Sequence, residues 1–391
     1  MLISYKTEIN PTDEQINKIL QCVGICRWLY NEYIAYNIRL YKLYVRGYLD
    51  ERQKHFISGM DFDKYVNNTL KKKEGFEWIS LCGSKARKKA IMTAEKAFKR
   101  FFQKKSGFPQ FKRKNRQNTK IYFPKNNPTD WTIERHRVKI PTFGFVRIKE
   151  FGYLPVDGKV VNGTISQRVN RFYVSVTVDV PERKFIRPRE KPLGIDLGVK
   201  ELAILSDGTM YRNINKDRVV KRLKKQLSRA QRRLARQLED KKKRGGTALA
   251  ANIKKSILKI QKFHAKLDFI RTNYENQVIH QIVMREPSHI TIEDLNVSGM
   301  MKNRHLARAI GECRFRTFRT KLTQKCCERG IEVRVVSTFY PSSKKCHECG
   351  NVKKDLKLSD RTYICDVCGH TMDRDVHAAM NLRDALEYIV A

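Results

Sequence analysis

The stretch LGIDLGVKELAILSDG, residues 193–208, places one aspartate inside an otherwise apolar strand pattern. Successive residues of a strand point to opposite faces, which puts Leu193, Ile195 and Leu197 on one face and Gly194, Asp196 and Gly198 on the other. Aspartate is disfavoured in strand interiors. Asp196 is therefore either an edge-strand or turn residue or a functional carboxylate, and this segment leaves both readings open.

The order of elements around this stretch predicts a fold. Residues 193–213 read as three short strands in succession, and a long helical pair follows to about residue 274, interrupted at Gly245–Gly246. HITIEDL (289–295) is a fourth strand, residues 306–330 a helix, IEVRVVS (331–337) a fifth strand and residues 375–389 a last helix. Three strands, helix, strand, helix, strand, helix is the order of an RNase H-like domain.

Two further carboxylates occupy corresponding places in this predicted domain. Glu293 ends the fourth strand, and Asp375 begins the last helix, where a plain capping role is the alternative. Together with Asp196 they can converge on divalent ions. Oxygen ligands suit Mg²⁺ or Mn²⁺, and two such ions about 4 Å apart can activate a water and stabilise a departing 3′ oxygen.

Four of the ten cysteines have the spacing of a zinc site. Cys346-x-x-Cys349 and Cys365-x-x-Cys368 are separated by fifteen residues, a pattern that indicates four thiolate ligands to Zn²⁺. His347 and His370 lie beside the two pairs, and because four thiolates complete the shell we interpret them as phosphate contacts or surface residues. The remaining cysteines are interpreted as core thiols: Cys22, Cys26, Cys82, Cys313, Cys326 and Cys327.

The composition indicates a folded protein that binds a polyanion. The 391 residues carry 81 Lys and Arg against 40 Asp and Glu, a net charge of +41, while 41% hydrophobic residues suffice for real cores. The N-terminus lacks the layout of a signal peptide and no apolar run is long enough to span a membrane. We therefore expect a soluble, cytoplasmic protein without a membrane partner.

The half before residue 181 is expected to combine helices with short strands. Residues 2–9 alternate like a strand, Thr12 and Gln15 form a helix-capping pattern, and helical patterns continue to about residue 105. From there to about Val180, short strand patterns between turn residues predict a small β-barrel or sandwich. Residues 181–192, with three prolines and dense charge, predict a linker.

These motifs together resemble the TnpB family of insertion-sequence proteins. The resemblance rests on GIDLGVKELAILSDG, ITIEDLNVSGM, the KKCHECG and ICDVCGH pairs and DRDVHAAMNL, and it extends to YKTEINPTDEQ, CRWLYNEYIAYN and GFPQFKRK near the N-terminus. It implies an RNA-guided nuclease related to compact type V CRISPR effectors. Its expected partners are a guide RNA from the transposon right end and double-stranded DNA beside a short adjacent motif, with no obligate protein partner.

The resemblance also implies an α+β multidomain organisation. A β-barrel wedge domain (1–10 and 119–182) would be interrupted by a helical recognition domain (11–118). A RuvC-like, RNase H-like nuclease domain (190–340 and 372–391) would carry an inserted zinc ribbon (341–371). Its metal-binding triad falls on Asp196, Glu293 and Asp375, the last being the second aspartate of DRD. The family's usual Asn two residues later is His377 here, which puts the orientation of that helix in doubt.

Candidate nucleic-acid contacts are basic residues near aromatic ones, and for these a solvated basic surface is the alternative. They are Lys112, Arg113, Lys114 and Tyr122 in the loop before the strands, Lys88 and Lys89 on a helix, and Lys344 and Lys345 beside the first cysteine pair. Two other functions remain open from the sequence. One is an RNA-guided DNA-binding repressor without cleavage, and the other is a DNA strand-transfer transposase.

Overall fold

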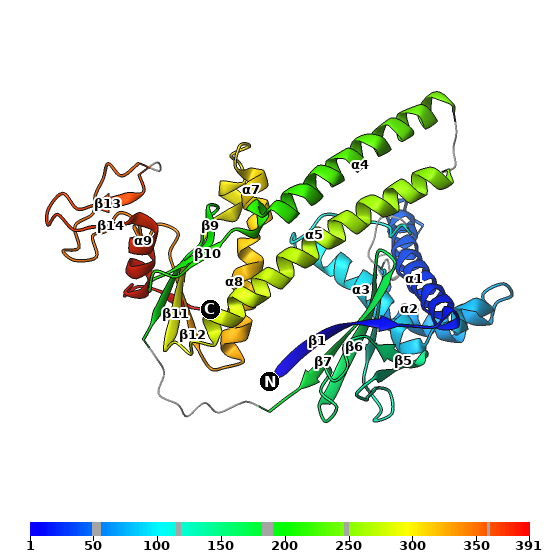
Figure 1. Cartoon of the computed structure of the whole chain (residues 1–391). Coiled ribbons are helices and arrows are strands. Elements are labelled where there is room, and N and C mark those ends of the chain that lie inside the picture. The colour runs from blue at the N-terminus through cyan, green and yellow to red at the C-terminus, as the bar shows by residue number, and fades with distance from the viewer. Residues whose placement is uncertain (49–55, 115–118, 182–190, 246–249, 358–359) are drawn as a thin grey trace. The chain divides into compact units, whose positions relative to one another are not determined.

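The computed structural model describes residues 1–48, 56–114, 119–181, 191–245, 250–357 and 360–391. The chain divides into two units, Met1–Pro181 and Glu182–Ala391 (Figure 1). Most of the predicted linker, residues 182–190, lies outside the described residues, as does Gly246 of the predicted helix break. No described helix is both long enough and apolar enough to cross a membrane.

The helices of the first unit begin at the predicted cap. Strand β1 (Leu2–Asn10) leads into α1 (Asp13–Val45), and the capping box is confirmed: Gln15 N–H donates to Thr12 Oγ1, while Thr12 N–H donates to Gln15 Oε1. Helices α2 (Gly59–Asn68) and α3 (Ser84–Phe102) follow, with short 3₁₀ turns between them. They share one core with the strands of this unit, and Tyr33 of α1 is fully buried in it.

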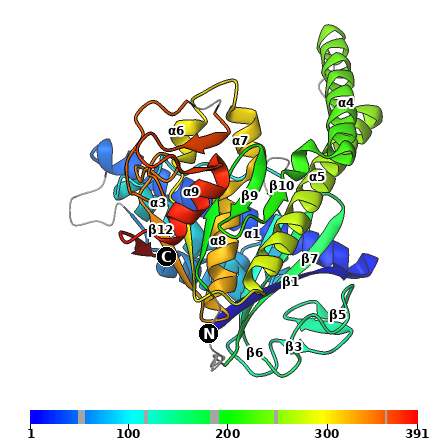
Figure 2. The ribbon, with the colours of Figure 1, turned by 60° about the vertical axis from the view of Figure 1, so that its left-hand side comes forward.

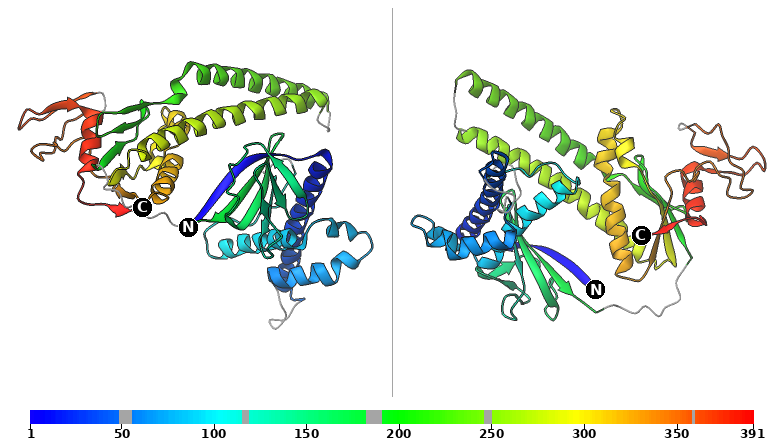
Figure 3. Two further views of the ribbon diagram at one scale, coloured as in Figure 1. Left: turned by 60° about the horizontal axis from the view of Figure 1, so that its bottom comes forward. Right: turned by 180° about the vertical axis from the view of Figure 1, so that it is seen from behind.

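The strands of the first unit form one seven-stranded sheet, ordered β2-β6-β7-β1-β5-β4-β3. Figure 3 shows the N-terminal strand β1, in blue, beside green strands of this sheet. Their bounds are β2 (Thr119–Pro124), β3 (Thr132–Ile133), β4 (Arg137–Ile140), β5 (Gly144–Ile148), β6 (Lys159–Arg168) and β7 (Arg171–Asp179). Among the described residues the end strands β2 and β3 do not pair with each other. The prediction of a closed barrel is therefore wrong, because alternation along single strands does not determine whether the outermost strands meet.

The second unit contains a six-stranded sheet ordered β10-β9-β8-β11-β12-β15. Strands β8 (Leu193–Asp196), β9 (Glu201–Leu205) and β10 (Met210–Arg212) are antiparallel neighbours, while β11 (His289–Glu293) runs parallel to both β8 and β12 (Glu332–Val336). These five strands lie where the sequence predicted them. The short β15 (Ile389–Val390) pairs with the outer side of β12 and was predicted as the end of the last helix.

Three sets of helices accompany this sheet. Helices α4 (Arg218–Lys243) and α5 (Ala251–Val283) form the predicted hairpin, seen in green in Figure 1. The helix predicted over residues 306–330 is instead two helices, α7 (Ala307–Cys313) and α8 (Phe315–Cys327), preceded by the short α6 (Val297–Met300). The break falls at Arg314, which adopts a left-handed conformation with φ of 57° and forms ion pairs with Asp268 and Glu275 of α5.

Helix α9 (Arg374–Arg383) packs directly on β8. Figure 2 shows α9, in red, next to β9 of the same sheet. The close approach requires the glycine of LGID, because a Cβ atom at Gly194 would lie 1.9 Å from the Ala379 carbonyl oxygen and 2.6 Å from the Arg383 nitrogen. Between β12 and α9 lies the insert that carries the four paired cysteines, with a small hairpin of β13 (Thr362–Ile364) and β14 (Thr371–Asp373). The sheet and α9 thus position the candidate site described next.

Candidate functional site

Three carboxylates predicted from separate motifs line one cavity of about 430 Å³ in the second unit. Asp196 comes from the end of β8, Glu293 from the end of the parallel strand β11, and Asp375 from the first turn of α9. Parallel strands end at the same edge of a sheet, and the packing of α9 on Gly194 brings its N-terminal turn to that edge. The fold therefore gathers groups that are 179 residues apart in the chain (375 − 196).

Burial and the repulsion of nearby carboxylates make Asp196 and Glu293 unusually easy to protonate. Burial raises the pKa of Asp196 to about 6, with a further contribution from the Asp375 carboxylate, while Arg374 opposes the shift. Burial likewise raises the pKa of Glu293 to about 7, and the charges of Asp196 and Asp294 add to it. A group of oxygen donors that repel one another in this way fits hard divalent cations, which would relieve the repulsion.

The two aspartates of DRD have different roles in the structure. Asp373 is the N-cap of α9, since its Oδ1 accepts hydrogen bonds from the backbone N–H groups of Asp375 (3.0 Å) and Val376 (3.1 Å). Asp375 lies in the cavity, and its carboxylate is 3.9 Å from the guanidinium of Arg361. The sequence left a capping role open for Asp375, but the residue that caps α9 is Asp373.

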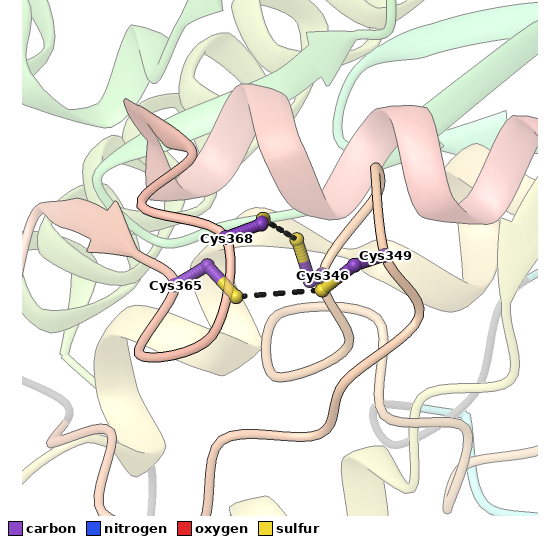
Figure 4. A group of neighbouring side chains, drawn as sticks. All are labelled: Cys346, Cys349, Cys365 and Cys368. Carbon is purple, nitrogen blue, oxygen red and sulfur yellow. Dashed lines mark hydrogen bonds between the residues drawn. The ribbon is translucent and has the colours of Figure 1, made fainter.

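The four paired cysteines form a cluster that could hold a metal ion (Figure 4). Their Sγ atoms all lie within 4.8 Å of one another, with 3.6 Å between Cys346 and Cys368 and 3.6 Å between Cys349 and Cys365. Within the described part of the chain no group of three carboxylates is gathered this tightly. The three carboxylates of the cavity are thus more widely spaced than the four sulfurs.

His377 connects this cluster to α9. Its side chain is fully buried, its ring stacks on Tyr363 at 4.0 Å between centroids, and its Nε2 accepts the backbone N–H of His347 at 3.1 Å. Burial, with His370 and His347 nearby, lowers the pKa of His377 to about 4, so that the ring is neutral and able to accept this bond. The histidine that departs from the expected asparagine therefore packs against the first cysteine pair.

Asn381, one turn further along α9, makes a second connection that the sequence analysis did not identify. Its side-chain amide donates to the backbone carbonyl oxygens of Ser342 (2.7 Å) and Lys345 (2.6 Å). The backbone carbonyl of Asn381 accepts a hydrogen bond from the Tyr340 hydroxyl at 3.0 Å. His377 and Asn381 are four residues apart and both buried on one face of the helix. The sequence signal for this face was the four-residue spacing of two polar side chains within a short helix, which places both on the same side.

Five of the six nucleic-acid candidates of the first unit, all except Lys88, line a second cavity of about 450 Å³ between α1, α3 and β2. The Asn31 side chain holds the backbone of Lys112 by two hydrogen bonds of 2.7 and 2.9 Å, and the Lys112 Nζ lies 3.7 Å from the centre of the Tyr30 ring. Lys89 lies similarly over Tyr122 at 4.7 Å. The cations that line this basic cavity are Arg27, Lys89, Lys112, Arg113, Lys114 and Lys120.

Several predicted residues lie elsewhere, and two were missed. Lys88 is exposed on α3 but does not line the basic cavity, whereas Arg27 and Lys120 line it without having been predicted. Lys344 lines the carboxylate cavity, and Lys345 lies in the turn held by Asn381. Of the six cysteines interpreted as core thiols, five are buried and Cys327 is exposed, so that interpretation is wrong for Cys327.

Three family models match parts of the chain. They are described as "Helix-turn-helix domain" (residues 1–44), "Probable transposase" (residues 173–304) and "Cas12f1-like, TNB domain" (residues 315–382). The last model spans α8, β12 and the cysteine insert to α9. The first coincides with β1 and the single long helix α1, so the described residues contain no helix-turn-helix there.

Relatives align over most of the chain at low identity. A protein of Escherichia coli (strain K12) described as "Putative RNA-guided DNA endonuclease InsQ" is 28% identical, with 100% of this chain and 94% of the relative covered. A Streptomyces pristinaespiralis protein described as "Putative RNA-guided DNA endonuclease" is 29% identical, with 97% of this chain and 88% of the relative covered. A CRISPR-associated endodeoxyribonuclease, Cas12f1 of Sulfoacidibacillus thermotolerans, is 24% identical over 55% of this chain and 50% of its own.

Solved structures of Cas12f assemblies also align along the chain. One with guide RNA and target DNA covers 98% of this chain and 99% of its own, at 16% identity and a TM-score of 0.35. A ternary complex covers 97% and 83%, at 14% identity and a TM-score of 0.39.

Proposed function

Because the chain belongs to the TnpB family, we propose that it is an RNA-guided DNA endonuclease. Its catalytic site for the hydrolysis of phosphodiester bonds would be formed by the carboxylates of Asp196, Glu293 and Asp375. The observation that carries this proposal is the single cavity lined by all three carboxylates. The names of the relatives aligned over nearly the whole chain support the same activity. The alternatives of a non-cleaving repressor and a strand-transfer transposase have no comparable support in the site.

The proposed domain organisation follows the family. The sheet order β10-β9-β8-β11-β12, with three antiparallel strands followed by two parallel ones, supports a RuvC-like, RNase H-like nuclease domain over 190–340 and 372–391. The insert at 341–371 is proposed as a zinc ribbon. In the first unit, residues 11–118 are proposed as the recognition domain, and residues 1–10 and 119–182 as the wedge domain, built on an open sheet.

The residues of the cavity fit the chemistry of metal-dependent hydrolysis. Bound Mg²⁺ or Mn²⁺ ions would supply charge that activates water and stabilises the leaving 3′ oxygen. Asp196 and Glu293, ionised once a cation offsets their repulsion, would hold the ions, and Asp375 would complete the set from α9. Lys344 and Arg374, which line the same cavity, would draw the DNA backbone toward the carboxylates.

The cysteine cluster is proposed to bind Zn²⁺ and so to position α9. Four sulfurs within 4.8 Å of one another fit a tetrahedral thiolate site. Ordering of this cluster would fix the backbone N–H of His347, which His377 accepts, and the turn that Asn381 holds. The ribbon would in this way set the place of the helix that carries Asp375.

The proposed partners are a guide RNA and target DNA, which would be met at the nucleoid of a prokaryotic cell. A net charge of +41 and the basic cavity at Lys89, Lys112, Arg113 and Lys114 support contacts with phosphates. The transposon-end origin of the guide and the adjacent DNA motif are proposed from the family.

Sequencing the RNA that co-purifies with the protein, followed by a cleavage assay, tests this function. Duplex DNA matched to the RNA and flanked by randomised sequence is expected to be cut with Mg²⁺ and not with a chelator. Glu293→Gln should abolish cutting while the RNA is retained. Tight DNA binding without any cutting would favour the repressor, and joining of DNA ends would favour the transposase.

A further inference from the structure

Phe339 is the most exposed large apolar side chain at the carboxylate cavity, with 94% of its surface exposed. It follows β12 by three residues and belongs to the same cavity lining as Asp196, Glu293 and Asp375. Single exposed apolar side chains are common on protein surfaces and need no special explanation. This ring does need an explanation, because it lies beside carboxylates and cations and not on a neutral surface.

The backbone on both sides of Phe339 is anchored although the ring is not. Thr338 Oγ1 donates to the Asp294 carbonyl, and the Tyr340 hydroxyl donates to the Asn381 carbonyl at 3.0 Å. The backbone N–H of Phe339 itself donates to Ser337 Oγ at 3.3 Å. A ring held out from a fixed turn loses little conformational entropy when a flat partner stacks on it.

The space on the two sides of Glu293 is suited to a nucleic-acid strand. A neighbouring cavity of about 350 Å³ shares Glu293 and Thr338 with the carboxylate cavity, so the two cavities lie next to each other. Arg316 and Arg319 line the neighbouring cavity, and Lys344 and Arg374 line the first. Cations thus lie on both sides of the carboxylates, as the phosphates before and after a cleaved bond require.

We propose that Phe339 stacks on a base of the DNA strand in this groove and so makes the site select unpaired strands. Aromatic rings bind single strands because every base has an exposed π-face once it leaves the duplex stack. In a duplex the same faces are covered by neighbouring bases, so Phe339 could not reach them. This inference rests on the proposed endonuclease function and assigns a positioning residue within that site.

The test compares Phe339→Ala, Phe339→Leu and Phe339→Trp in the protein purified with its RNA. The substrate is a DNA strand that pairs with the guide and carries an unpaired extension. Loss of one base stack predicts that Phe339→Ala lowers kcat/KM by about 5- to 150-fold. Phe339→Trp should retain cleavage, and Phe339→Leu should resemble Phe339→Ala, because leucine is apolar but offers no flat ring.

An abasic scan of the extension separates stacking from a merely structural effect. Where the base that contacts Phe339 is removed, the wild type should fall to the rate of Phe339→Ala, and the two proteins should then be equal. A second readout uses the fluorescence of 2-aminopurine at each position without added Mg²⁺, so that no cleavage occurs. The signal should change with Phe339→Ala at one position only. Phe269→Ala, at an exposed phenylalanine on α5, serves as the matched control.

Two outcomes would overturn the inference while leaving the endonuclease proposal intact. One is equal kcat/KM for the wild type and Phe339→Ala, and the other is a reduction that persists unchanged at every abasic position. If the wild type cuts no DNA at all, the endonuclease proposal fails and the inference fails with it.

Discussion

At the residue scale, the fold disfavours the ionised form of the Asp196 carboxylate unless a cation is bound beside it. Its raised pKa, about 6, means that the folded protein binds a proton more readily than the unfolded chain between about pH 4 and 6. The stability linked to that proton is therefore lost as the pH rises through this range. The ionised Asp196 carboxylate therefore lowers the free energy of unfolding most at neutral and alkaline pH.

Asp196→Asn should accordingly stabilise the metal-free protein at pH 8 by on the order of 2 kcal/mol and leave it unchanged near pH 4. It should also remove most of the rise in melting temperature that Mg²⁺ produces in the wild type. Thermal unfolding with and without a chelator measures both effects. Glu387→Gln, at an exposed carboxylate of the same unit, is the control and should do neither. Equal stability of Asp196→Asn and wild type at pH 8 would contradict the argument.

The aspartates of DRD give a second prediction at this scale. Asp373→Ala removes the N-cap of α9 and should cost about 1 kcal/mol in urea unfolding while leaving measurable cleavage. Asp375→Ala should leave stability nearly unchanged and abolish cleavage. Parallel unfolding curves and cleavage rates compare the two variants. The reverse pattern would mean that the first aspartate is the functional one.

The sequence alone singled out the three carboxylates that line the cavity, but not all the contacts that connect α9 to the cysteine insert. Asp196 and Glu293 stood out because an acidic residue in an apolar strand pattern is unusual. The contacts of His377 and Asn381 could not be found in the same way, since their partners lie in an insert whose path the sequence pattern does not specify.

At the scale of elements, the packing of α9 on β8 depends on one missing side chain. Gly194→Ala would place a Cβ atom 1.9 Å from a carbonyl oxygen of α9, so the helix must shift. Such overpacking costs about 1–3 kcal/mol, and cleavage should fall because Asp375 moves with the helix. Gly311→Ala is the matched control, since its Cβ would meet only Met301 at 3.7 Å. Unfolding and cleavage assays on both variants check this, and unimpaired cleavage by Gly194→Ala would oppose it.

The cysteine insert gives the corresponding prediction for metal removal. Cys365→Ser, or extraction of zinc, should reduce cleavage far more than RNA binding, because α9 loses the partners of His377 and Asn381. A structural zinc contributes on the order of 10 kcal/mol to the folding of its own module. Zinc content, RNA affinity and cleavage are to be measured on one preparation. Metal loss with full cleavage would show that the ribbon does not position the helix.

Elements were predicted well where a pattern is local and poorly where tertiary contacts decide. The cap at Thr12 and the strands β8 to β12 follow from short-range spacing. The break at Arg314 does not, because its left-handed backbone accompanies ion pairs to α5, residues 39 to 46 positions earlier (314 − 275 and 314 − 268). Closure of the first sheet likewise depends on strands that are neighbours only in space.

At the scale of the whole molecule, the charge of +41 predicts strongly salt-dependent RNA binding. The logarithm of affinity should fall with the logarithm of salt concentration, by roughly 0.7 to 0.9 for each phosphate neutralised. Replacing Lys89 and Lys112 by Gln should lower the slope by about 1 to 2 if the basic cavity contacts the backbone. Filter binding across a salt series measures the slope, and Lys88→Gln, outside the cavity, is the control. An unchanged slope would place the RNA elsewhere.

The position of α9 after the other site motifs affects when activity can arise during synthesis. A ribosome delivers Asp196, then Glu293, then both cysteine pairs, and only afterwards Asp375. Segments made early can fold and hold RNA while the rest is still being translated. A nascent chain therefore lacks the third carboxylate, and with the proposed zinc site even a released chain would need zinc before that carboxylate is in place. Translation and metal uptake would together delay cleavage until Asp375 is in place.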